Sequence, residues 1–275
     1  MSGQKSADPI NVEDKPLDME SVKTPRNPDL ISVTDAESPV VEQYRHLFSR
    51  VDLACKAKDK RVIAVTSCAE GEGKTVTVSN LAIVAARDFG RRVMLIDADF
   101  RHPTLSNYFK LESGKGLIDV LMRQADLEKV FVPGPHPNLT ILPMGQWSQS
   151  KRENVNLGRL KEILPIVRKQ YHTIRWEEKL EGFLQTEKQE VGLFDYVFVD
   201  TPPIMPGSEM YPISEVVDAI LLVVRSGDVS KRSIQYAAHV LDSEKIIGAV
   251  LNRASVPWPL RYNEYMYYGH NEPNR

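Results

Sequence analysis

The chain has 275 residues and nearly balanced charge, with 35 Lys and Arg against 37 Asp and Glu. This balance provides no overall basic field for nucleic acid. Two cysteines, Cys55 and Cys68, are too few for a disulfide framework or a four-ligand zinc site. No apolar run approaches the roughly 20 residues of a membrane-spanning helix, and the N-terminus lacks a signal-peptide pattern. The composition predicts a soluble intracellular protein with no direct membrane span.

The N-terminal residues 1–37 differ in composition from the rest. They contain no aromatic side chain, several prolines and more acidic than basic residues. Such a segment buries too little apolar area to offset its ordering entropy, so we expect a disordered or loosely docked leader. Ser38 and Pro39 form an N-cap and N1 pair that begins a helix. Its apolar positions recur at roughly helical spacing, and they are Val40, Tyr44, Leu47, Phe48 and Val51.

From Arg61 onward, short apolar runs alternate with helical stretches. Six such runs are predicted strands, at 62–65, 93–96, 139–142, 196–199, 219–224 and 246–251. Continuous β-branched runs separated by helices are typical of a parallel sheet covered on both faces. We therefore predict one doubly wound α/β domain with a mostly parallel sheet over residues 38–253. A flexible tail over 254–275 follows it.

Residues 151–190 carry many charges of both signs, and the region predicts one or two exposed helices. Its basic residues allow a nucleic-acid role as an alternative. Acidic residues such as Glu153, Glu162 and Glu177 are interleaved with them, which favours an ordinary solvated helical face.

A phosphate-binding loop follows the first predicted strand. Its sequence ends in Gly71-Glu72-Gly73-Lys74-Thr75, which fits the end of the Gly-x4-Gly-Lys-Ser/Thr pattern, although Cys68 replaces the first glycine. Glycines let backbone amides turn toward phosphate oxygens, and the next helix adds its positive dipole end. We expect the lysine to reach the β and γ phosphates and the threonine to bind Mg²⁺.

Acidic residues follow two other predicted strands. Asp97 and Asp99 come directly after the second, and Asp200 after the fourth. The carboxyl ends of parallel strands are where such sheets bind ligands. Any one such Asp is more often a cap or turn residue, but three strand ends delivering these groups to one edge predict a Mg²⁺–nucleotide site. We expect Asp99 and Asp200 to act through metal-bound water and Asp97 to accept the nucleophile's proton. The spacing leaves open an exchange of roles between Asp97 and Asp99.

These motifs resemble those of the bacterial tyrosine kinases that accompany capsule and exopolysaccharide export. The resemblance covers about residues 38–268. Its nucleotide motifs lie at 71–75, 95–103 and 199–203, with further similarity at 116–121, 138–143, 218–225 and 248–253. The implied fold is a P-loop NTPase of the MinD/ParA type, with ATP and Mg²⁺ as cofactors and tyrosine as the acceptor. The nucleotide-binding residues that it implies are Gly71, Glu72, Gly73, Lys74, Thr75, Val76, Asn252 and Arg253.

The C-terminal tail supplies candidate acceptors. Tyr262, Tyr265, Tyr267 and Tyr268 are four of the ten tyrosines, and a disordered tail has no need of aromatic residues. Docking of these rings on the domain surface is the alternative. Beside a kinase-like site, autophosphorylation of a neighbouring subunit is favoured. Each phosphate adds about −1.5 to −2 charge, which would weaken the tail's hold on that neighbour.

The resemblance also implies self-association and a separate membrane partner that activates the kinase at the inner face of the cell membrane. One departure from the family's sequence pattern affects the expected self-association. Residues 42–48 are similar to the family's Glu-x-x-Arg-x-x-Arg helix, which mediates ring formation, but Phe48 replaces its second Arg. Bidentate carboxylate pairing at that position is lost, although Arg50 is a possible substitute. The region 151–192 is longer than usual for the family.

Two rival functions remain. A MinD/ParA-like ATPase switch shares all three motifs, but such proteins carry an extra Lys where this chain has Ala69. A non-catalytic nucleotide-binding scaffold of a polysaccharide export complex would be favoured by degraded motifs, yet the lysine, threonine and aspartates are all present. Redox control through Cys68 in the loop is a further possibility, and a small residue at a tolerant position is favoured over it.

Overall fold

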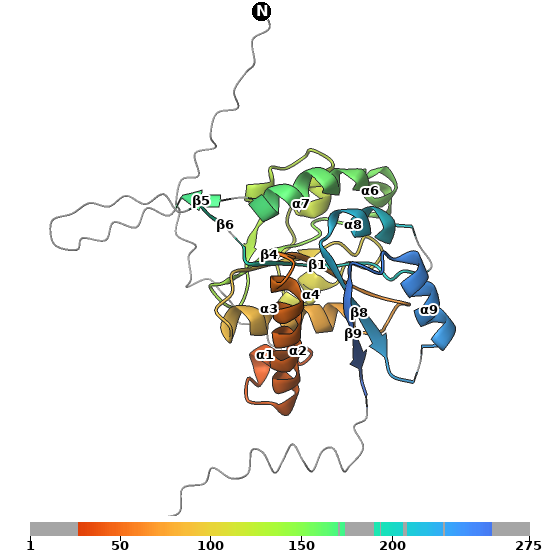
Figure 1. The fold of residues 1–275 in the computed structure, drawn as a ribbon. Coiled ribbons are helices and arrows are strands. Elements are labelled where there is room, and N and C mark those ends of the chain that lie inside the picture. The colour runs from red at the N-terminus through yellow and green to blue at the C-terminus, as the bar shows by residue number, and fades with distance from the viewer. Residues whose placement is uncertain are drawn as a thin grey trace, which may run out of the picture.

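The computed structural model describes residues 27–169, 171–173, 190–192, 194–205, 208–227 and 229–254. A seven-stranded sheet lies at its centre, in the order β3-β4-β2-β7-β1-β8-β9 (Figure 1). Its strands are β1 (Val62–Ser67), β2 (Val93–Asp97), β3 (Val132–Pro133), β4 (Leu139–Leu142), β7 (Tyr196–Asp200), β8 (Ala219–Arg225) and β9 (Ile246–Asn252). All neighbours pair in parallel except β3, which is antiparallel to β4. The predicted mostly parallel α/β fold with its six strands is confirmed.

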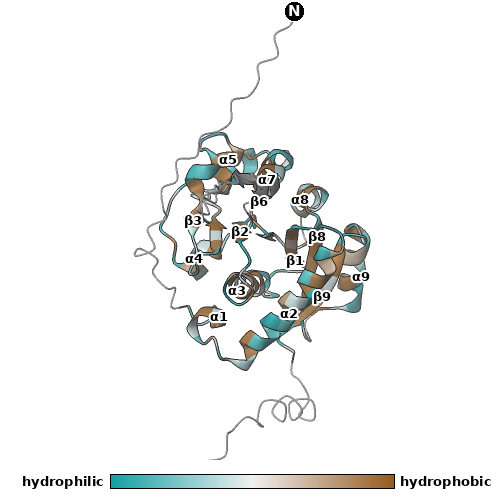
Figure 2. Ribbon diagram, turned by 60° about the vertical axis from the view of Figure 1, so that its left-hand side comes forward, coloured by the Kyte–Doolittle hydropathy of each residue, from teal (hydrophilic) through white to brown (hydrophobic). Residues whose placement is uncertain are grey.

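Helices cover both faces of the sheet. One face carries α1 (Ile31–Thr34), α2 (Pro39–Lys56), α3 (Lys74–Arg87) and α4 (Leu105–Phe109). The other carries α5 (Leu117–Leu121), α7 (Leu160–Lys169), α8 (Met210–Val216) and α9 (Lys231–Val240). Strand residues alternate between the two cores, and β1, β2 and β7 are buried along their whole length. Figure 2 shows these apolar strands enclosed between the helical layers. A strand that is buried on both faces has a continuous apolar run in its sequence, as these strands do.

The charged region after residue 146 contains several short elements. They are α6 (Gln149–Asn154), a 3₁₀ helix (Leu157–Arg159), and an antiparallel pair formed by β5 (Tyr171–Thr173) and β6 (Glu190–Gly192). Another 3₁₀ helix (Leu127–Val130) precedes β3. Helix α7 is amphipathic rather than wholly exposed, because Leu160, Ile163 and Leu164 are buried against the core. None of the helices in the described ranges is long and apolar enough to cross a bilayer.

Helix α2 begins as predicted, since the Ser38 hydroxyl accepts the Val40 N–H and Pro39 occupies the first turn. Its buried face is Val41, Phe48, Val51 and Cys55, whereas Val40 is exposed.

The segment just before α2 is folded against the domain. Leu30 is fully buried, and the Asn80 side chain on α3 accepts the Ser32 N–H and donates to the Asp29 carbonyl, at 2.9 and 2.8 Å. These bonds satisfy backbone groups that a docked segment would otherwise bury unpaired. Of the two alternatives for the leader, disordered or loosely docked, residues 27–37 follow the docked one. Residues 1–26 lie outside the described residues.

Candidate active site

The phosphate-binding loop connects β1 to α3. Gly71 and Gly73 have φ values of +77° and +92°, a backbone conformation that side chains disfavour. A Cβ on Gly73 would lie 2.2 Å from Nδ2 of Asn252, so this position also lacks room for a side chain. Helix α3 begins at Lys74 directly after this glycine. The loop therefore presents backbone amides and the helix N-terminus at the carboxyl end of β1, as anion binding requires.

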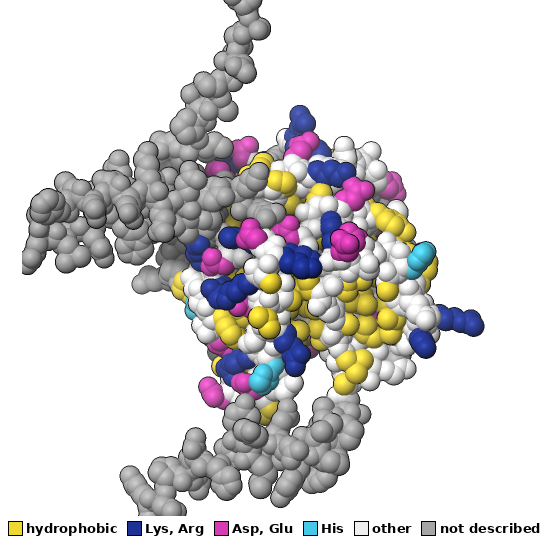
Figure 3. Space-filling model, viewed as in Figure 1, with side chains coloured by type: hydrophobic (Ala, Val, Ile, Leu, Met, Phe, Trp, Pro, Cys, Tyr) yellow, Lys and Arg dark blue, Asp and Glu magenta, His cyan; other side chains and the backbone are white. Residues whose placement is uncertain are grey.

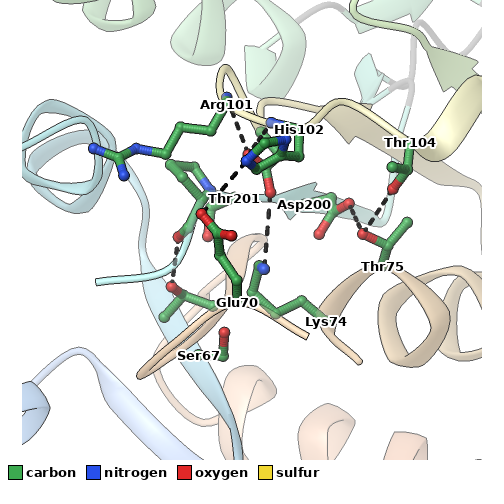
Figure 4. Close-up of polar contacts among 12 residues, drawn as sticks. Ser67, Glu70, Lys74, Thr75, Arg101, His102, Thr104, Asp200 and Thr201 are labelled. Carbon is green, nitrogen blue, oxygen red and sulfur yellow. Dashed lines mark hydrogen bonds and ion pairs between the residues drawn. The ribbon is translucent and has the colours of Figure 1, made fainter. Parts of the chain in front are cut away.

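Lys74 and Asp99 face each other at this edge. The lysine is 7% exposed, and its Nζ lies 3.8 Å from Oδ2 of Asp99, which is 4% exposed. The other carboxylate oxygen, Oδ1, accepts the backbone N–H groups of Arg101 and His102 at 3.1 and 3.0 Å. These bonds hold the Asp99 carboxylate beside the lysine. Figure 4 shows Lys74 with Arg101 and His102 above it, and Thr75 pointing to Asp200. The ion pair neutralises a buried cation that a phosphate would otherwise compensate.

Thr75 and Asp200 form a second contact at this edge. The threonine Oγ1 donates to Oδ2 of Asp200 at 2.6 Å, and Thr104 Oγ1 lies 3.4 Å from the same hydroxyl. Oδ1 of Asp200 is buried and has no hydrogen-bond partner. Burial raises the pKa of Asp200 to about 7, although the Lys74 charge opposes this shift. A buried carboxylate oxygen without a partner indicates a group that a cation is suited to satisfy.

Asp97 lies beside Asp200 on the adjacent strand, because β2 and β7 pair in register at these two residues. It is fully buried, and its two oxygens accept the N–H groups of Asp99 and Leu105, each at 3.2 Å. Burial and the neighbouring Asp200 raise its pKa well above the usual value of an aspartate. Two adjacent carboxylates in a buried site favour at least one bound proton.

These residues fit a magnesium–nucleotide complex. Within the described ranges, no three His, Cys, Asp or Glu side chains form a metal cluster by themselves. Mg²⁺ commonly binds one or two carboxylates, water and substrate phosphates instead of an all-protein cage. The Thr75 hydroxyl is suited to bind such an ion directly, and the unpartnered oxygen of Asp200 is suited to accept a hydrogen bond from its water. The glycine loop beside them is suited to hold the phosphates.

The remaining predicted nucleotide-binding residues surround the loop in different ways. Glu72 is 2% exposed and turned inward, where its carboxylate accepts the N–H groups of Ala69 and Arg225. Its side chain supports the loop, so only its backbone remains for the nucleotide. Asn252 donates to the Glu72 carbonyl at 2.8 Å, which places the end of β9 against the loop. Arg253 is exposed, and Val76 is half-buried in the first turn of α3.

Sequence reasoning missed an ionic cluster beside the site. Glu209 accepts both Nε and Nη2 of Arg101 at 3.1 Å and Nη2 of Arg152 at 2.6 Å. It thereby joins the loop after Asp99 to α6 and α8. Thr104 was also missed. The only sequence feature that points to the Glu209 cluster is Arg101, which lies two residues after Asp99. Glu209 and Arg152 lie far from Arg101 in the sequence, so no local pattern connects them.

Two further predictions concern cysteine and α2. Burial raises the pKa of the Cys68 thiol to about 11, so it is protonated at neutral pH and unsuited to redox control.

In helix α2, Phe48 is fully buried, with its ring centroid 4.7 Å from that of Phe89. Arg45 pairs with Glu42 and Asp88 of the same chain, both at 2.8 Å. The four tail tyrosines lie outside the described residues.

Comparisons with known proteins identify the family of this chain. Residues 63–266 match the family described as the CobQ/CobB/MinD/ParA nucleotide binding domain. Tyrosine-protein kinase YwqD of Bacillus subtilis is 28% identical, over 87% of this chain and 91% of the relative. Tyrosine-protein kinase CpsD of Streptococcus pneumoniae is 30% identical, over 83% and 90%. The chain belongs to the bacterial tyrosine kinase family. This membership confirms the resemblance and the assignment as a tyrosine-protein kinase.

Solved structures agree about the fold of this bacterial tyrosine kinase. The kinase domain of the Escherichia coli tyrosine kinase ETK superimposes with a TM-score of 0.67 at 24% identity, over 88% of each chain. The septum site-determining protein MinD from Pyrococcus horikoshii, complexed with Mg-ADP, gives a TM-score of 0.55 at 22% identity and covers 74% of this chain. Both likenesses concern the fold alone. The predicted MinD/ParA-like P-loop fold is confirmed.

Proposed function

We propose that this kinase transfers the γ-phosphoryl group of ATP to Tyr262, Tyr265, Tyr267 and Tyr268 in the tail of a second copy of the chain. The observation that carries the proposal is the convergence of Lys74, Thr75, Asp99 and Asp200 at one edge of the sheet. Membership of the tyrosine kinase family supplies the reaction class. The tail tyrosines are the proposed acceptors, because the tail follows Asn252, whose side chain contacts the loop.

In this proposal the site works mainly by positioning and by electrostatics. The amides of the glycine loop and Lys74 hold the β and γ phosphates. Thr75, Asp200 and Asp99 hold Mg²⁺, the last two through water. When bound, Mg²⁺ neutralises charge on the phosphate oxygens during transfer. We assign the contact with adenine to Asn252 and Arg253, at the end of β9.

Asp97 is proposed to accept the proton of the attacking phenol. Its raised pKa suits proton acceptance near neutral pH. The tyrosine oxygen bonds to the γ phosphorus, the bond to the β–γ bridging oxygen breaks, and the phenolic proton passes to the carboxylate. The reverse assignment gives this role to Asp99. In that case Asp97 takes the water-mediated magnesium contact, so Asp97→Asn would weaken MgATP binding, whereas Asp99→Asn would bind MgATP and fail in transfer. The first assignment predicts the opposite pattern, so MgATP affinity measured beside activity distinguishes the two.

The biological setting is proposed to be control of capsule or exopolysaccharide synthesis and export. A relative named succinoglycan biosynthesis transport protein ExoP, from Rhizobium meliloti, is 26% identical over 85% of this chain, which spans 27% of that protein. We place the kinase at the inner face of the cell membrane, bound to a membrane adaptor that activates it, and self-associated during transfer. No role with nucleic acid is proposed.

The proposal is tested with two complementary variants of the full chain. Lys74→Met retains the tail tyrosines but loses the phosphate contact, whereas replacing all four tail tyrosines with Phe retains the site. The two variants are mixed with MgATP and the adaptor's cytosolic segment. We expect the four-Phe variant, whose site is intact, to phosphorylate tail tyrosines of the Lys74→Met chain. Phosphosite mapping by mass spectrometry reads the result.

Other outcomes select the rivals. ATP hydrolysis without phosphotyrosine in the wild-type chain favours a MinD/ParA-like switch, whose fold this chain shares. Binding of ATP with neither reaction favours a non-catalytic scaffold. Loss of ATP binding in the tyrosine-to-Phe variant shows that the rings are structural. Phosphotyrosine in the wild-type chain but not in the mixture assigns the transfer to the same chain.

A further inference from the structure

Strand β9 leaves one edge of the sheet open within the described residues. It pairs with β8 on one side and is the terminal strand on the other. The carbonyl of Asn252 accepts the Ser226 N–H at 2.9 Å, so this residue directs its backbone groups toward β8. Because these directions alternate along a strand, the N–H and C=O groups of Ala249 and Leu251 point outward. An unpaired edge of this kind is a template for another strand.

Both faces of β9 also expose apolar surface. Leu251 is 60% exposed, and Ala249 on the same face is exposed too. Between α2 and the first half of β9 lies a groove of about 380 Å³, whose lining includes Leu47, Leu53 and Gly248. Leu53 is 76% exposed. Figure 3 shows apolar side chains gathered on this side of the molecule. An exposed edge with apolar surface on both faces predicts an apolar partner strand.

The chain itself supplies such a segment a few residues after β9. Residues 256–260 read Val-Pro-Trp-Pro-Leu, an uninterrupted apolar run. We propose that this run, the docking segment, pairs antiparallel with the outer edge of β9 in the same chain. The four residues between Leu251 and Val256 match the length of hairpin connections.

The positions of the two prolines fit this pairing. Pro257 and Pro259 lack an N–H, and their spacing of two places both on the same side of a strand. When Val256 and Trp258 direct their backbone groups toward Leu251 and Ala249, both prolines direct theirs to solvent. The outer edge is then blocked against further strands. The apolar side chains of Val256 and Trp258 cover Leu251 and Ala249, and the prolines lie on the groove side.

The docking segment also affects where the tyrosines emerge, an effect that rests on the proposed function. Five residues in an extended strand span about 16 Å. They run from the loop end of β9, where Asn252 contacts the phosphate-binding loop, back toward the other end. Tyr262 follows Leu260 by two residues, or at most about 7 Å. Docking therefore keeps Tyr262 away from the nucleotide site of its own chain and leaves it accessible to a second copy.

Amide hydrogen exchange of the full chain, without ATP, tests the docking. The amides of Ala249 and Leu251 are expected to exchange at least about tenfold more slowly in the wild type than in Trp258→Asp. Tyr267→Asp adds the same charge beyond the docking segment and is the matched control, with wild-type rates expected. Amides in β1 report whether Trp258→Asp remains folded, and a Trp258→Ala variant, with the same loss expected, excludes an effect of the charge.

Three outcomes would overturn the proposal. Exchange of the Ala249 and Leu251 amides at unprotected rates in the wild type would show an open edge. Protection that persists in both Trp258 variants would assign the edge to another segment. Protection that is lost on hundredfold dilution would assign it to a second copy. Because no readout uses ATP, failure of the kinase proposal leaves this test unaffected.

Discussion

Replacing Asp200 with Asn should stabilise the protein without ligands and abolish its activity. The carboxyl is fully buried, and its pKa is about 7 instead of 3.8 because burial disfavours the charged form. As pH rises from about 4 to about 7, the unfolded chain loses this proton before the folded chain does. The folded state then binds more protons, so the free energy of unfolding falls as pH rises.

The expected magnitude follows from that pKa difference. A difference of roughly three pKa units corresponds to at most about 4 kcal/mol, since each unit is about 1.36 kcal/mol. Asp200→Asn also removes a negative charge that offsets buried Lys74, so we expect a gain of about 2 kcal/mol at pH 8. The gain should shrink toward pH 4 and vanish below the unfolded pKa of 3.8, where the wild-type carboxyl is protonated in both states.

Urea unfolding between pH 4 and pH 8, with a chelator and without nucleotide, measures this difference. Asp35→Asn removes one negative charge from an exposed position and should leave the pH dependence unchanged. MgATP-dependent phosphorylation should be lost in Asp200→Asn and retained in Asp35→Asn. The reasoning is refuted if Asp200→Asn is as stable as the wild type, or less stable, at pH 8 with an unchanged urea dependence.

Three other substitutions test the loop and its surroundings. Gly73→Ala places a Cβ 2.2 Å from Nδ2 of Asn252 at a φ of +92°, so ATP affinity measured by calorimetry should fall at least about tenfold; unchanged affinity would contradict the loop geometry. Asn80→Ala removes the hydrogen bond to the Ser32 N–H and should cost about 1–2 kcal/mol, with faster amide exchange confined to residues 27–34. Phe48→Arg puts a guanidinium where a ring is fully buried, and the unfolding free energy should fall by about 3 kcal/mol or more. A stable Phe48→Arg protein would show that α2 can turn this position outward.

The nucleotide site was largely predictable because its residues are tied to strand ends. Apolar β-branched runs predicted the six strands, and parallel strands bring their carboxyl ends to one edge. Hence Lys74, Thr75, Asp97, Asp99 and Asp200 could be placed together before any coordinates. The left-handed turn at Gly73 follows from residue type as well, since glycine adopts that conformation most easily.

The orientation of side chains could not be predicted in the same way. Sequence did not show that Glu72 turns inward to support the loop, or that Asp200 keeps one oxygen without a partner. Those outcomes depend on packing around each group. The Glu209 contacts to Arg101 and Arg152 join segments distant in sequence, and local patterns carry no information about such pairs.

Local periodicity and residue type are enough to specify the strand pattern, the phosphate-binding loop and the acidic strand ends. Only the folded structure decides that residues 27–37 pack on α3, that the Glu72 side chain turns inward under the loop, and that β9 is the terminal strand of the sheet within the described residues. Each of these depends on which surfaces meet after the chain has folded. Their energies come from contacts between distant segments, which no local window of sequence contains.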